Sequence, residues 1–115
     1  MRLGEPNMDD DVPTRLKREI ADLYLKNSKK LDAVDAGALQ SFALKVLEII
    51  SRMNSSFQLS HDLEVLKESM THLKNDSLKL QKAKPNSDDY DFARNDCKSL
   101  LNSVKRWLKL EGLLS

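Results

Sequence analysis

The chain has 115 residues, of which 32% are charged and 5% aromatic, with a formal net charge of +1. This length suits one domain, and a net charge near zero argues against a strongly basic nucleic-acid-binding domain. Glycine and proline occur three times each, so long helices are favoured over a sheet of many strands. The single cysteine excludes an internal disulfide, and we expect neither a signal peptide nor a membrane-spanning helix.

The first twelve residues contain Gly4, Pro6 and four acidic residues, with little apolar surface to bury. We therefore expect residues 1–12 to be a disordered lead-in and residues 13–112 to form one helical domain. Apolar residues then recur at intervals of three and four, the pattern of helices with one buried face. Because such faces need partners, the sequence predicts a compact all-α bundle.

Two helices are predicted in the first half of the chain. The first spans about 14–28, with Thr14 as its N-cap. The second begins after Asp35, which can cap it, and stops at the polar residues that start with Asn54. Its apolar face is the most regular in the chain and contains Leu39, Phe42, Ala43, Val46, Leu47, Ile50 and Met53.

The second half of the chain predicts two long helices and a short one between them. The third helix starts after Ser60, and its pattern weakens at "KNDS", where Ser77 is expected to cap a separate short helix. Pro85 breaks the chain, and Ser87 caps a last helix that stops near Gly112. The apolar face of this last helix contains Ala93, Cys97, Leu100, Val104 and Trp107. The prediction is a bundle of four long helices and one short helix.

Residue types that carry catalysis or bind metal show no convincing spacing. His61 and His72 are separated by about three helical turns, or roughly 16 Å, which is too far to share a metal ion. We recognise no other ligand set and no glycine-rich phosphate loop. Cys97 lies on an apolar face, where a nucleophile would lack exposure and a base. We therefore expect a protein that is not an enzyme and that has no metal and no cofactor.

A mildly basic run lies between the third predicted helix and Pro85. It contains Lys74, Lys79, Lys82 and Lys84. A solvated helix face explains it most simply, although it can also attract an acidic peptide or phosphates. Aromatic residues are not interleaved with these lysines, which argues against stacking on bases. Nucleic-acid binding by this run is the alternative function. Phe57, in "NSSFQLS", is expected either to anchor a loop or to border a groove.

The segment "RLKREIADLYLKNSKKLDAVD" (15–35) resembles the first helix and following loop of the TFIIS N-terminal domain family, also called LW domains. Within that family it is most similar to the integrase-binding domain of lens epithelium-derived growth factor. The matching elements are "RL" at 15–16, "KNS" at 26–28, and "KLD" at 30–32 followed by Val34 and Asp35. Looser similarity in 43–69 and in "SVKRWLKL" (103–110) extends the resemblance to about 14–110. It implies that the bundle is right-handed.

The resemblance also implies a function. Such a domain is a nuclear protein–protein interaction module of a transcription elongation or chromatin factor. It docks short, disordered, acidic segments that contain phenylalanine, in a groove between inter-helical loops. By position, Leu31 supplies an apolar contact and Asp32 accepts backbone N–H groups of the partner. The residues expected to bind the partner are Lys30, Leu31, Asp32, Val34, Phe57, Lys74, Lys79, Lys82 and Lys84.

Simple energetics are compatible with this role for the "KLD" loop. Burying one leucine is worth about 1.5–3 kcal/mol, and a charge-assisted hydrogen bond about 1.5–3 kcal/mol. The alternative is that Leu31 and Asp32 only close the helical hairpin. We expect a monomer that does not contact a membrane, and self-association through an exposed apolar helix face is a further possibility.

Overall fold

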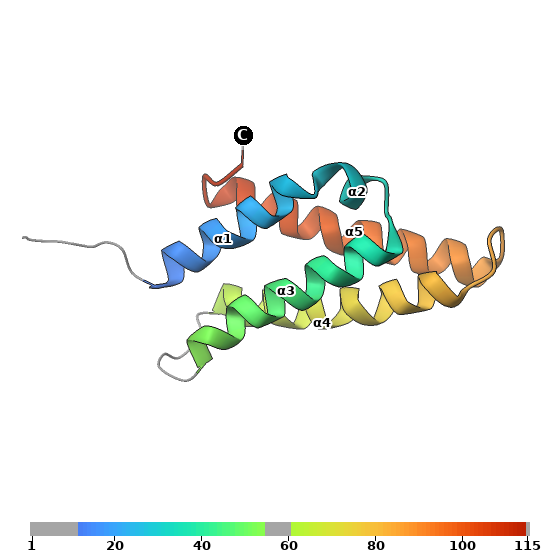
Figure 1. The fold of residues 1–115 in the computed structure, drawn as a ribbon, viewed down its shortest axis with the longest axis horizontal. Helices are drawn as coiled ribbons and strands as arrows, with labels where there is room; N and C mark the ends of the chain where they lie inside the picture. The colour runs from blue at the N-terminus through green and yellow to red at the C-terminus, as the bar shows by residue number, and fades with distance from the viewer. Residues whose placement is uncertain (1–11, 55–60, 115) are drawn as a thin grey trace, which may run out of the picture.

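The computed structural model describes residues 12–54 and 61–114, in which every regular element is an α-helix (Figure 1). The all-α prediction is therefore confirmed for these ranges. No helix within them combines the length and the hydropathy of a membrane span. The helices in chain order are α1 (Val12–Lys26), α2 (Ser28–Asp32), α3 (Ala36–Asn54), α4 (His61–Lys82) and α5 (Asp88–Leu110).

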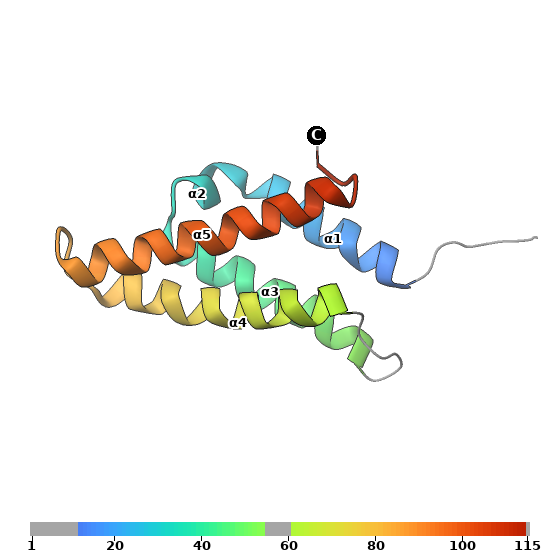
Figure 2. The ribbon, with the colours of Figure 1, turned by 180° about the vertical axis from the view of Figure 1, so that it is seen from behind.

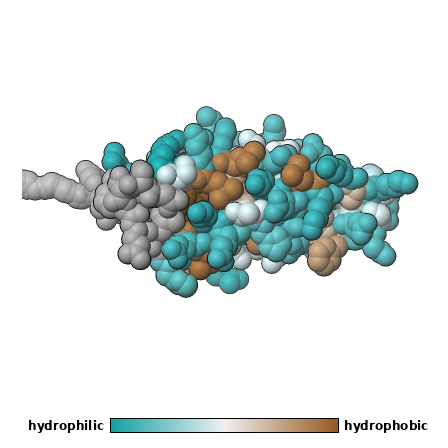
Figure 3. Space-filling view, turned by 90° about the horizontal axis from the view of Figure 1, so that it is seen from below, coloured by the Kyte–Doolittle hydropathy of each residue, from teal (hydrophilic) through white to brown (hydrophobic). Residues whose placement is uncertain are grey.

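Helix α4 packs along both α3 and α5, and each of these pairs is antiparallel (Figures 1 and 2). Helix α1 lies against α3, and the short α2 fills the corner between α1 and α3. The face that α3 and α4 present is largely hydrophilic, with some hydrophobic side chains showing between the polar ones (Figure 3). The charged residues therefore lie outside an aliphatic interior, as the composition indicates.

A single hydrophobic core collects residues from all five helices. The predicted apolar faces of the earlier helices supply most of it, but the face of α5 differs from the prediction. Its buried residues are Ala93, Cys97, Leu101, Val104 and Leu108, whereas Leu100 and Trp107 are only partly buried. Leu101 and Leu108 therefore take the buried positions that were predicted for Leu100 and Trp107, while Ala93, Cys97 and Val104 are buried as predicted.

Two of the predicted helix N-caps, Asp35 and Ser87, are confirmed, whereas Ser60 lies outside the described residues. The Asp35 carboxylate accepts the N–H of Ala38 at 3.0 Å at the start of α3. The Ser87 hydroxyl accepts the N–H of Tyr90 at 3.1 Å at the start of α5. Gly112 follows α5 with a φ of +76°, the left-handed conformation that glycine adopts readily after a helix.

Helix α4 is continuous, so the predicted separate short helix at Ser77 is wrong. Ser77 is buried and its hydroxyl donates to the carbonyl of Lys74 at 2.8 Å, inside the helix. The apolar pattern weakens there because Asp76 and Ser77 occupy buried positions. Helix α1 begins at Val12, two residues before the predicted cap Thr14. Phe57 and residues 1–11 lie outside the described ranges.

The connection between α1 and α3 is folded into the core. Leu31 in α2 is 0% exposed, and Val34 is also buried. The expectation that Leu31 turns outward to a partner is therefore wrong. Both side chains belong to the hydrophobic core. Val34 has a φ of +58°, which is rare for a β-branched residue, and its burial offsets that strain.

We expect Leu31→Ala to lower the free energy of unfolding by about 2–5 kcal/mol, because truncating a buried leucine leaves a cavity. Leu25→Ala is the matched control, since Leu25 is 54% exposed and should change stability by less than about 0.5 kcal/mol. Urea unfolding monitored by circular dichroism measures both. Equal effects of the two substitutions would contradict the burial of Leu31.

Candidate functional site

Asp32, the last residue of α2, links three helices through one carboxylate oxygen. Its Oδ1 accepts the hydroxyl of Tyr24 in α1 at 2.9 Å and the ammonium of Lys105 in α5 at 3.4 Å. Its side chain is 50% exposed. Within residues 12–54 and 61–114, both contacts that Asp32 receives reach Oδ1. Its Oδ2 is therefore available for a further donor.

Tyr24 shows that Asp32 also has a structural task. The Tyr24 ring is buried and packs edge-on against Phe42, with ring centroids 6.4 Å apart. Burial raises the pKa of the Tyr24 hydroxyl, and the hydrogen bond and charge of Asp32 raise it further. Lys105 lies 5.9 Å from the centre of the Tyr24 ring and acts in the opposite direction on this pKa. Asp32 thus fastens α2 to its neighbours, as the hairpin-closing alternative supposes.

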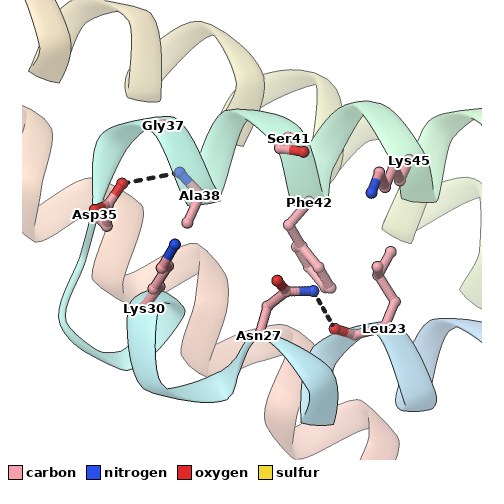
Figure 4. A pocket seen from close by; sticks show the side chains of 9 residues that line it. All are labelled: Leu23, Asn27, Lys30, Asp35, Gly37, Ala38, Ser41, Phe42 and Lys45. Atoms are coloured by element: carbon pink, nitrogen blue, oxygen red, sulfur yellow. Dashed lines mark hydrogen bonds between the residues drawn. The ribbon is translucent and has the colours of Figure 1, made fainter.

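A cavity of about 380 Å³ opens beside α2, between the end of α1 and the start of α3 (Figure 4). Leu23, Ala38 and Phe42 supply its apolar wall, and Lys30 and Lys45 stand at its edges. Its volume falls within the range of about 300–1,000 Å³ of ligand pockets. Asn27, Asp35 and Ser41 supply polar groups to the rest of the lining. The two ammonium groups outnumber the one carboxylate, so the cavity suits a ligand that combines an apolar group with negative charge.

Asn27, between α1 and α2, helps to shape this cavity. Its side-chain amide donates to the carbonyl of Leu23 at 2.9 Å, within the last turn of α1 (Figure 4). The Asp35 cap holds the first turn of α3 on the opposite side. These local hydrogen bonds order the end of α1 and the start of α3, which form two walls of the cavity. The sequence gives no direct signal for it, because its residues come from three helices.

The structure does not gather the predicted partner-binding residues into one place. Lys30 lines the cavity, while Asp32 contacts Tyr24 and Lys105 instead. Leu31 and Val34 are in the core. The lysines of the basic run lie along α4 and in the connection to α5, and most are exposed: Lys74, Lys79, Lys82 and Lys84. Within the described ranges no ion pair joins them to α2.

We expected no set of His, Cys or carboxylate residues with the spacing of metal ligands. The structure corrects this, because it brings three such residues together. His72 and Asp76 lie one turn apart on α4, and Asp96 of α5 faces them. One ligand atom from each residue lies within 4.8 Å of the other two. The spacing of His72 and Asp76 is visible in the sequence, whereas Asp96 joins them only through the packing of α4 on α5.

Cys97, the next residue after Asp96, is buried. Burial raises the pKa of its thiol to about 12, and the charges of Asp76 and Asp96 contribute to the rise. At neutral pH the side chain is therefore a thiol, without the thiolate that a nucleophile needs. We assign Cys97 to the core.

Comparison of this chain with protein-family models, with curated proteins and with solved structures finds no significant match. Function must therefore be inferred from the site itself. Two features of the corner formed by α1, α2 and α3 are informative. They are the half-exposed carboxylate of Asp32 and the cavity between Lys30 and Lys45.

We expect the Tyr24 hydroxyl to titrate above its ordinary pKa of 10.0. Because the folded state then holds this proton more tightly than the unfolded state, its contribution to stability is lost as pH rises above 10. Asp32→Asn should lower the Tyr24 pKa without returning it to 10.0, since the charge is lost but the burial persists. Absorbance titration in a Tyr90→Phe background isolates Tyr24. An unchanged Tyr24 titration in Asp32→Asn would contradict the coupling.

Proposed function

We propose that this chain is a protein–protein interaction module of a nuclear transcription elongation or chromatin factor. In this proposal the helices form the right-handed bundle of the TFIIS N-terminal domains, with Ser28–Asp32 as the short helix. The module docks short, disordered, acidic segments that contain phenylalanine. The resemblance of "KLD" (30–32) supports the proposal. The observation that carries it is the cavity at the α1, α2 and α3 corner, which is lined in part by Leu23, Ala38 and Phe42 and flanked by Lys30 and Lys45.

Because Leu31 is buried, it cannot contact a partner. In this proposal the cavity therefore supplies the apolar contact. A phenylalanine of the partner can contact Leu23, Ala38 and Phe42 there. Acidic residues next to that phenylalanine then lie near Lys30 and Lys45. Ion pairs at such exposed positions are individually weak and mainly select the sign of the ligand's charge.

Asp32 engages the same segment from the other side of α2. Its free Oδ2 can accept a backbone N–H group of the partner in a charge-assisted hydrogen bond. A helix is roughly 10–12 Å wide, and an extended chain covers about 3.3 Å per residue. A short segment of the partner can therefore pass from the cavity around α2 to Asp32. Because the partner loses conformational freedom on docking, we expect a modest affinity.

The alternative of nucleic-acid binding by the run from Lys74 to Lys84 has less support. Lys79 lies 4.0 Å from the carboxylate of Asp76. Asp88 and Asp89 open α5 directly after the run. These acids and the net charge of +1 weaken the local positive potential on which phosphate binding depends. We therefore prefer the docking function, with the protein acting as a monomer.

The proposal can be tested with a synthetic acidic peptide that contains one phenylalanine. We expect its affinity to fall at least about tenfold, or ~1.4 kcal/mol, in Lys30→Glu and in Lys45→Glu, because each places a carboxylate beside an acidic ligand. Asp32→Asn should have an effect of similar size while keeping the acceptor for Tyr24. Isothermal calorimetry measures the affinities, and amide chemical shifts locate the bound peptide.

Lys98→Glu on α5 is the matched control, because it makes the same charge change at an exposed position outside the cavity. A peptide in which alanine replaces phenylalanine tests the apolar contact. The docking site is wrong if Lys98→Glu weakens binding as much as Lys30→Glu does. It is also wrong if the shifts map to the groove between α4 and α5 that Val65 and Trp107 line. Binding of duplex DNA that weakens steeply with salt would favour the alternative.

A further inference from the structure

Three side chains converge between α4 and α5, which lie side by side in both views of the ribbon (Figures 1 and 2). The Nε2 atom of His72 lies 3.1 Å from Oδ2 of Asp76 and 3.0 Å from Oδ2 of Asp96. His72 and Asp76 share one face of α4 because they are four residues apart. Asp96 reaches the same point from α5. One imidazole nitrogen therefore faces two carboxylates on different helices.

Asp76 is unusual in this group because it is buried. The residue is 2% exposed, and a buried carboxylate normally has its oxygens paired. Its Oδ2 nevertheless has no hydrogen-bond partner in the described ranges. The 3.1 Å approach of His72 is an ion-pair distance, but it lacks the geometry of a hydrogen bond. An unsatisfied acceptor thus points into the cluster from the core.

The surrounding charges do not compensate the cluster well. The ammonium of Lys79 is close to Asp76, but its Nζ lies 4.0 Å from Oδ1, on an exposed side chain. Two carboxyl groups, one of them buried, therefore face one imidazole nitrogen.

We propose that His72, Asp76 and Asp96 bind one divalent transition-metal ion of the Zn²⁺ class, which clamps α4 to α5. Zinc accepts imidazole nitrogen and carboxylate oxygen at about 2.0–2.2 Å. Tetrahedral geometry with such bonds places donor atoms roughly 3.3 Å apart, close to the observed 3.0 and 3.1 Å. An imidazole in the ligand set favours zinc over Mg²⁺ or Ca²⁺.

The exposure of the three ligands indicates how the ion enters. The side chains of His72 and Asp96 are 57% and 31% exposed, so the outer side of the site is open to solvent. Water can therefore complete the coordination, as in zinc sites with three protein ligands. Asp76 anchors the ion from the core side. The competing occupant of the cluster is a proton, held by His72 or shared between the two carboxyls.

The test uses the full chain after treatment with a chelator, titrated with ZnCl₂ at neutral pH by isothermal calorimetry. We expect one equivalent to bind and the melting temperature to rise with zinc concentration, since the ion binds only the folded arrangement. His72→Ala and Asp96→Asn should each weaken binding at least about tenfold. Both side chains are partly exposed, so the helix content measured by circular dichroism should not change. MgCl₂ should leave the melting temperature unchanged.

His61→Ala is the matched control, because it removes the other histidine of α4 from an exposed position outside the cluster. It should bind zinc as the unmodified chain does. The proposal is overturned if the chain takes up no zinc at concentrations up to about 100 µM. It is equally overturned if His72→Ala binds zinc as tightly as His61→Ala. Either result assigns the cluster to proton sharing.

Discussion

Burial of Leu31 is the constraint from which the surface around α2 follows. Successive residues of a helix are separated by about 100°, so Lys30 and Asp32 point to opposite sides of a helix that turns Leu31 inward. Lys30 therefore lies at the cavity beside α3, and Asp32 lies against Tyr24 and Lys105. The core leucine, although it cannot touch a partner, decides where both charged neighbours are presented.

Helix α4 shows the opposite case, in which a buried face carries polar groups. Ser77 is satisfied inside the helix by the carbonyl of Lys74, so its burial costs little. Asp76 lies beside it with one oxygen unpaired, and a buried charge without good pairing is expensive. The stability of the α4 and α5 pair therefore depends in part on what neutralises Asp76.

Much of the fold could be predicted because it depends on interactions between residues that are close in the sequence. The rest depends on contacts between helices, which the sequence does not show directly. The caps Asp35 and Ser87 act within one turn, and the apolar face of α3 repeats over several turns, so both are visible in the sequence. The short α2 has too few residues to show a period. The continuity of α4 was hidden because Asp76 and Ser77 interrupt its apolar pattern from buried positions.

The candidate sites also combine features that the sequence shows with features that depend on how the helices pack. The exposure of Asp32 agrees with the prediction for the "KLD" segment, but its bonds to Tyr24 and Lys105 depend on how α1 and α5 pack. The cavity needs three helices, and the His72 cluster needs Asp96 from a second one. A sequence can show a pair on one helix, as with His72 and Asp76, and it leaves the third member to the packing.

Asp32 illustrates how a structural role and the proposed binding role can coexist in one residue. An ionised carboxylate has two oxygens and about four acceptor sites, and Tyr24 and Lys105 use only Oδ1. An amide in its place keeps one oxygen acceptor, but its other group is a donor and would repel a partner's N–H. The two tasks are therefore separable by chemistry at a single position. The fold uses one acceptor there, and the proposed docking would use the second.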